Sequence, residues 1–159
     1  MGVDLGYDKN GNILTMNQMG LRSVLASNSA YVDQLSYTYQ NGSNKLANVS
    51  DAAAANGNSL GDFQDGSNGG DDYSYDANGN MISDANKGIS SIQYNYLNLP
   101  QTITMTGKGT ISYTYDAGGN KLQKQVVDNT NSTTTTTQYL GGLIYQNDVL
   151  QSIPQEEGR

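Results

Sequence analysis

Large apolar and small polar residues alternate in short runs along this chain. In "ISYTYD", Ile111, Tyr113 and Tyr115 alternate with Ser and Thr, and a period of two places the large side chains on one face of a β-strand. The segments "LSYTYQ" (35–40) and "IQYNY" (92–96) repeat this alternation. No segment keeps a helical period over three turns. The pattern predicts an all-β chain of about a dozen short strands.

One eight-residue phrase recurs along the chain, beginning with Tyr and ending with an aliphatic residue. The copies are "YDKNGNIL" from Tyr7, "YQNGSNKL" from Tyr39, "YDANGNMI" from Tyr75, "YLNLPQTI" from Tyr96 and "YDAGGNKL" from Tyr115. A further Tyr stands two residues before most of them, at Tyr37, Tyr73, Tyr94 and Tyr113. Repetition of a strand, turn and strand unit predicts successive antiparallel hairpins that form a twisted, curved open sheet.

The centre of each phrase is rich in Gly and Asn, which tolerate the positive φ of hairpin turns such as type I′. We assign the turns to Gly11, Gly79, Gly118 and Gly119, and Asp116 to a turn residue that accepts hydrogen bonds from local backbone N–H groups. Further turns are predicted at 86–88, 107–109 and 146–148. The run Thr133–Thr137 is predicted to be a strand because it is rich in β-branched residues.

The segment from about 50 to 72 breaks this rhythm, since it is rich in Gly, Asn and Asp. We interpret it as a long loop inserted between strands, with a helical turn at 52–55 and apolar anchors at Leu60 and Phe63. Strand patterns are similar on both sides of it, so the whole chain, 1–159, is expected to be a single repeat unit.

Composition excludes several classes of function. The net charge of −7 and the pI near 4.2 disfavour nucleic acid and anionic membrane surfaces as partners. The absence of Cys and His removes disulfides, thiolate nucleophiles, the usual zinc sites and the commonest general base. No apolar run approaches the ~18 residues of a membrane span, and the first residues do not resemble a signal peptide. Any export signal is therefore expected outside this segment.

Carboxylates are the main candidates for chemistry. Asp62, Asp65, Asp71 and Asp72 could hold calcium on a flexible loop, but their spacing matches neither the EF-hand loop nor the nonapeptide calcium repeat, and a solvated loop is the favoured interpretation. A hydrolase would have to use these residues or Glu156 and Glu157, and no Ser stands in a setting that suggests a Ser-Lys nucleophile. The sequence therefore predicts no catalytic residue, no cofactor and no metal site.

The repeated Tyr residues admit two interpretations. Paired on adjacent strands they stabilise a sheet, at about 0.2–1 kcal/mol per cross-strand pair. Exposed on one face, they could instead bind sugars in an extracellular adhesion or glycan-binding module. Their strict alternation with Ser, Thr and Asn favours the structural role.

The phrases "GYDKNGNIL", "DYSYDANGNMISDANKGI", "YNYLNLPQTI", "YTYDAGGNKLQK" and "YLGGLIYQNDVLQSIPQEEGR" resemble the bacterial Rhs, or YD-repeat, proteins, near their C-terminal core. The resemblance covers nearly the whole chain and transfers only structural positions, the repeated Tyr residues and their turns. Two copies depart from it, since Gln40 and Leu97 replace the Asp after Tyr.

The resemblance implies a β-shell, made of hairpins, that encloses a C-terminal toxin or effector in competition between bacteria or in toxin delivery. It implies a secreted or surface-displayed parent and a catalytically inert wall. Five repeats are too few to close such a shell, so we expect a fragment of a larger protein. Its expected partners are the rest of the shell and its toxin, and open sheet edges are expected to favour self-association.

Overall fold

The computed structural model describes residues 2–21, 29–53, 63–66 and 69–153. These residues form strands β1 to β13 in antiparallel sheets and contain no helix, which confirms the all-β prediction. Accordingly, no helix in this part of the chain is long and apolar enough to cross a membrane. The chain folds as two compact units, Met1–Ser74 and Tyr75–Arg159. That the two units act as one repeat domain stays a prediction.

The first sheet has the strand order β1-β2-β3-β4, the order of the chain. Its strands are β1 (Gly2–Tyr7), β2 (Ile13–Leu21), β3 (Ser29–Tyr39) and β4 (Leu46–Asp51). Each strand pairs antiparallel with the next. The phrases that begin at Tyr7 and Tyr39 are therefore the turns of two hairpins, as the sequence predicts.

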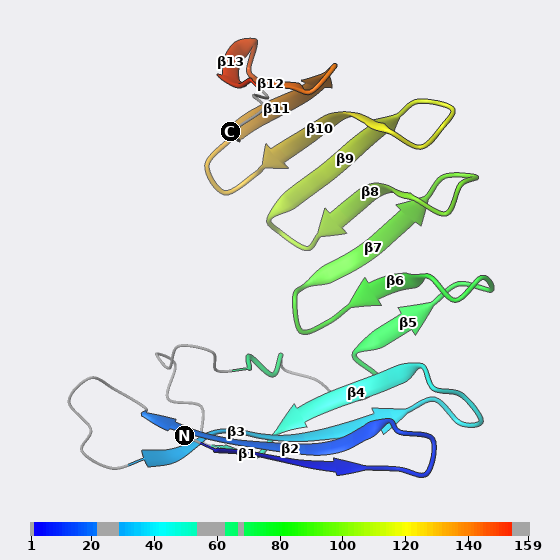
Figure 1. The fold of residues 1–159 in the computed structure, drawn as a ribbon, viewed down its shortest axis with the longest axis vertical. Helices are drawn as coiled ribbons and strands as arrows, with labels where there is room; N and C mark the ends of the chain where they lie inside the picture. The colour runs from blue at the N-terminus through cyan, green and yellow to red at the C-terminus, as the bar shows by residue number, and fades with distance from the viewer. Residues whose placement is uncertain (1, 22–28, 54–62, 67–68, 154–159) are drawn as a thin grey trace. The chain divides into compact units, whose positions relative to one another are not determined.

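The second sheet is a longer meander, in which β5 to β13 follow one another in chain order (Figure 1). Its strands are β5 (Tyr73–Tyr75), β6 (Met81–Asp84), β7 (Ile89–Tyr94), β8 (Pro100–Met105), β9 (Gly109–Tyr115), β10 (Lys121–Asp128), β11 (Thr133–Leu140), β12 (Leu143–Gln146) and β13 (Val149–Ser152). The Thr run lies in β11, as predicted. Successive turns lie at opposite ends of the strands (Figure 1).

The strand register separates an apolar face from a polar face in the second sheet. Ile111 of β9 pairs with Ile103 of β8 and with Val126 of β10, and directly paired residues project to the same face. The residues directly before and after them along each strand project to the opposite face and are mostly Thr, Ser and Gln. The alternation read from "ISYTYD" is therefore the alternation of the sheet faces.

The units differ in how much apolar surface they bury. The first unit buries Val32, Leu35, Ala47 and Val49, each no more than 5% exposed. In the described part of the second unit, Ile92 alone is a buried apolar side chain. The second sheet is thus a single layer whose apolar face has no covering layer among the described residues of its own unit.

The turns at 86–88, 107–109 and 146–148 lie where the sequence predicts them. Gly88 and Gly107 have φ of 66° and 71°. Neighbouring turns are also linked, because the backbone N–H of Thr106 donates to the Gly88 carbonyl and that of Asn129 to the Lys108 carbonyl. Asn147 and Asp148 both have positive φ, as a two-residue type I′ turn requires.

The inserted loop begins two residues later than the predicted start at residue 50, because β4 continues to Asp51. In the predicted helical turn at 52–55, residues 52 and 53 are described and are not helical; residues 54 and 55 and the anchor Leu60 lie outside the described residues. Phe63 is described, and its backbone N–H donates to the carboxylate of Asp33, 2.7 Å away. The Asp33 side chain is only 2% exposed, so the loop is tied to the first sheet at this point.

Candidate functional site

The repeated turn is a compact network around one carboxylate, illustrated by the β5–β6 hairpin. The Asp76 N–H donates to the Asn80 carbonyl, and the Gly79 N–H donates to the Asp76 carbonyl. Oδ1 of Asp76 accepts from the N–H groups of Asn78 and Asn80, while Oδ2 accepts from the Asn80 side-chain amide at 2.9 Å. One carboxylate thus holds the whole turn.

The same network recurs at Asp8 with Asn12 and at Asp116 with Asn120. In all three turns the Asn side-chain amide is the main cause that lowers the pKa of the Asp, and backbone N–H groups add to it. The carboxylates are therefore used within their own turns, as expected for Asp116, rather than presented as acids or ligands.

Only one residue in each of these turns needs positive φ. Gly11, Gly79 and Gly119 have φ of 84°, 90° and 83°, which favours Gly. Gly118 is not among the positive-φ residues and occupies the position of Asn10 and Asn78. The hairpins have three-residue loops that end in a left-handed residue, not two-residue type I′ turns. Gly118 lies in its turn, as the sequence predicts, but only Gly119 needs the conformational freedom of Gly.

Replacing Gly118 with Asn is expected to stabilise the second unit by about 0.4–1 kcal/mol, because it restricts the unfolded chain at a compatible position. An added Cβ would lie 3.4 Å from Asp116 Oδ1 and 3.5 Å from Asn120 Nδ2, which is ordinary contact. The matched variant Gly119→Ala is expected to destabilise by about 1–2 kcal/mol because of its positive φ. Urea denaturation measures both, and equal effects of the two substitutions would contradict this assignment.

The fourth hairpin keeps the turn geometry with different residues. The Asn95 N–H donates to the Leu99 carbonyl, and Asn95 Oδ1 accepts from the N–H groups of Leu97 and Leu99. Asn98 has a φ of 56°, in the place of Gly79. The structural counterpart of Tyr75 is therefore Tyr94, not Tyr96, and the alignment of this copy on Tyr96 was wrong by two residues.

Tyr hydroxyl groups link consecutive hairpins. Tyr39 donates to the Ile13 carbonyl at 2.8 Å, Tyr94 to the Met81 carbonyl at 2.7 Å, and Tyr115 to the Pro100 carbonyl at 2.9 Å. Each acceptor is the first residue of the second strand in the preceding hairpin. Burial is the main cause that raises the pKa of each of these Tyr side chains. The last Tyr of each of these strands is thus a structural link within its sheet.

The other repeat Tyr residues occupy more varied places. Tyr7 lies at the end of β1 and is 55% exposed. Tyr37 lies in β3, and Tyr73 and Tyr75 are the ends of β5; burial raises the pKa of Tyr37 and Tyr75. Tyr113 lies in β9 beside Tyr115, with ring centroids 6.2 Å apart.

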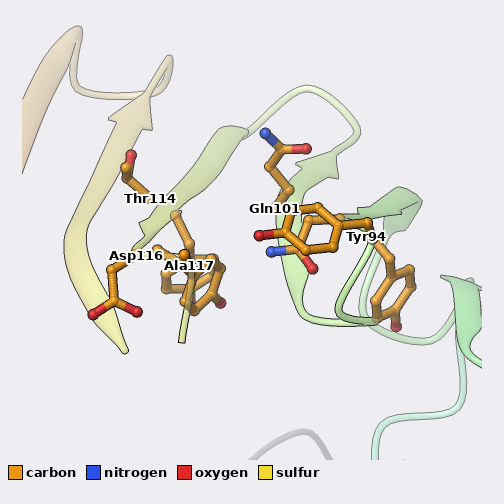
Figure 2. Close-up of a pocket in the computed structure, with 9 residues that line it drawn as sticks. Tyr94, Gln101, Thr114, Asp116 and Ala117 are labelled. Carbon is orange, nitrogen blue, oxygen red and sulfur yellow. The ribbon is translucent and has the colours of Figure 1, made fainter. Parts of the chain in front are cut away.

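An open groove of about 570 Å³ lies between the tips of the β7–β8 and β9–β10 hairpins. Its lining includes four Tyr side chains and two amides: Tyr94, Tyr96, Tyr113, Tyr115, Asn95 and Gln101. In Figure 2, Tyr94 and Gln101 lie on one side, and Thr114, Asp116 and Ala117 lie on the other. The described residues that line this groove therefore offer both aromatic surface and hydrogen-bonding groups to a ligand.

The described acidic loop residues make separate contacts. The Asp72 side chain is 1% exposed and accepts a hydrogen bond from the Val49 N–H at 2.8 Å. Asp65 accepts from the Asp51 N–H at 3.3 Å, and Asp71 is exposed. Asp62, Glu156 and Glu157 lie outside the described residues. Within the part of the chain that the structure describes, no group of three or more acidic side chains is placed to hold a metal ion.

Neither a scan against protein-family models nor a search of the curated proteins finds a match for this chain.

Proposed function

We propose that this chain is a catalytically inert wall segment of an Rhs or YD-repeat shell, which in the parent protein encloses a C-terminal toxin or effector. The observation that carries the proposal is the hydroxyl link from one hairpin to the preceding one, made by Tyr39, Tyr94 and Tyr115. Each hairpin is thus bonded to the preceding one through the last Tyr of its first strand, so that further hairpins can extend the sheet in the same way.

The single-layer form of the second sheet supports a wall. A sheet with an apolar face gains stability when another layer covers that face. Ile103, Ile111 and Val126 share one face, and none of them is fully buried. In the proposed shell this face lies against other parts of the parent protein.

The outer strands support continuation of the sheet by further repeats or by a second copy. β1 and β13 are the outermost strands of their sheets at the ends of the described chain. Val3 of β1 is 60% exposed, and Val149 of β13 is 61% exposed. Unpaired strand edges pair with other strands, so the isolated chain is expected to self-associate. Analytical ultracentrifugation that shows only monomer at high concentration would count against this part.

The test uses the complete reading frame that encodes this segment. Sequencing is expected to show more Tyr and turn repeats with a distinct C-terminal domain, and the expressed protein is expected to appear in electron microscopy as a hollow shell. Limited proteolysis should leave the C-terminal domain intact while the shell is closed. A frame without further repeats, or an extended particle with a freely cleaved C-terminal domain, would overturn the proposal.

Two variants relate the wall to the hydroxyl links. Replacing both Tyr94 and Tyr115 with Phe removes two hydroxyl links, each worth about 0.5–1.5 kcal/mol, and is expected to speed cleavage of the enclosed domain. The matched control Tyr96→Phe removes a hydroxyl group that makes no described hydrogen bond from a side chain that is 81% exposed. The control should leave cleavage unchanged.

A further inference from the structure

Tyr96 is an aromatic residue that the repeat does not require. It stands directly after the turn-forming Asn95, where the comparable turns have Lys9, Ala77 and Ala117. Its side chain is 81% exposed, and it belongs to no strand of the sheet. Cross-strand pairing and the hydroxyl links therefore leave Tyr96 without a structural role, although it lines the groove between the hairpin tips.

The groove also contains amide groups that the fold does not use. The exposed Gln101 side chain makes no hydrogen bond to another described residue, and the Nδ2 group of Asn95 is unused because only its Oδ1 accepts from the turn. The carboxylate of Asp116, in contrast, is occupied by the N–H groups of its own turn. The free polar groups of the groove are thus neutral.

We infer that this groove is a binding site for a neutral sugar. An exposed Tyr ring presents a flat apolar surface and a polar hydroxyl group, which suits the apolar C–H face and the hydroxyl groups of a pyranose. Amides can donate to sugar hydroxyls and accept from them. The groove volume of about 570 Å³ falls within the range of small-molecule sites.

The charges at the groove favour a neutral sugar over the other ligands that bind to Tyr side chains. Asp116 is the one charged residue among the described residues that line the groove, and its negative charge disfavours an anionic sugar or a phosphate. Tyr cages also bind quaternary ammonium groups, but the ammonium group of Lys121 already lies 4.7 Å from the centroid of the Tyr113 ring. That positive charge disfavours a second cation beside the same ring.

The experiment is a titration of the isotope-labelled chain with maltose, cellobiose, lactose and N,N′-diacetylchitobiose, followed by NMR. At least one disaccharide is expected to cause saturable shifts at Asn95, Tyr96 and Gln101. Tyr96→Ala places at this position the residue found in two of the three comparable turns, so the fold is expected to persist, and binding should weaken at least tenfold. Tyr7→Ala, which removes an exposed Tyr in the other unit, should leave the affinity unchanged.

Three outcomes would overturn the inference: no saturable shift with any of the four disaccharides, equal shifts in Tyr96→Ala, or binding of choline without binding of a sugar. The inference does not rest on the wall proposal. A wall segment without a sugar site and a sugar site on a chain that builds no shell are separate results, distinguished by this titration and by the proteolysis of the parent protein.

Discussion

Replacing Gly109 with Ala is expected to destabilise the second unit by about 3 kcal/mol or more, because two independent strains add. Gly109 begins β9 with a φ of 138°, a conformation that L side chains rarely adopt. A Cβ atom added there would overlap the carbonyl oxygen of Val127, a backbone atom of the neighbouring strand. The substitution must therefore open the pairing of Gly109 with Asp128.

Gly107→Ala is the matched control for this prediction. Gly107 lies two residues earlier in the same turn and has a φ of 71°, but an added Cβ would meet no atom within 4 Å. Its expected cost is about 1–2 kcal/mol, from the left-handed conformation alone. Urea denaturation followed by circular dichroism compares the two variants, and a Gly109→Ala variant as stable as Gly107→Ala would show that the β9–β10 contact is not close.

The hairpin order and the position of most turns follow from local sequence, because a period of two and a Gly near each turn are short-range signals. The finer geometry does not follow in the same way. Gly107 and Gly109 look equivalent in "GKG", although only Gly109 is pressed against a neighbouring strand. That contact comes from residues almost twenty positions away, and no pattern within the turn reports it.

The fourth repeat shows how a repeated letter can mislead. Matching on Tyr aligned Tyr96 with Tyr75, whereas the backbone aligns Tyr94. Asn95 and Asn98 are the signal that could have corrected the register: Asn Oδ1 accepts the same turn hydrogen bonds as Asp, and Asn tolerates positive φ. In the corrected register, Tyr96 is a turn residue, and this position explains why its side chain lines the groove and not a strand face.

Asp72 shows that local sequence patterns do not predict contacts between segments that are distant in the chain. Its segment is rich in Gly, Asn and Asp, so composition favours an exposed loop that could hold a cation. In the structure, the Asp72 N–H donates to the Ala47 carbonyl, and its Oδ2 accepts from the Val49 N–H. Asp72 is buried and Asp71 is exposed because of how the loop packs against β4. The sequence of the loop alone does not distinguish these two residues.

Replacing Asp72 with Ala is expected to cost the first unit about 1–3 kcal/mol, the range for a buried donor left without its partner. The donor is the backbone N–H of Val49, whose side chain is 3% exposed, so water does not readily replace the carboxylate. Thermal or urea denaturation without added metal measures the loss. Asp71→Ala, at the exposed neighbouring residue, is expected to change stability by no more than about 0.5 kcal/mol.

The same pair of variants separates a structural carboxylate from a calcium ligand. A ligand that binds only the folded state raises stability as its concentration exceeds the Kd, so a calcium site would make the melting temperature depend on calcium. We expect the melting temperature of the unsubstituted chain to be the same in calcium and in chelator, and Asp72→Ala to be destabilised equally in both. A calcium-dependent rise that Asp71→Ala also removes would instead assign the two Asp residues to one cation site.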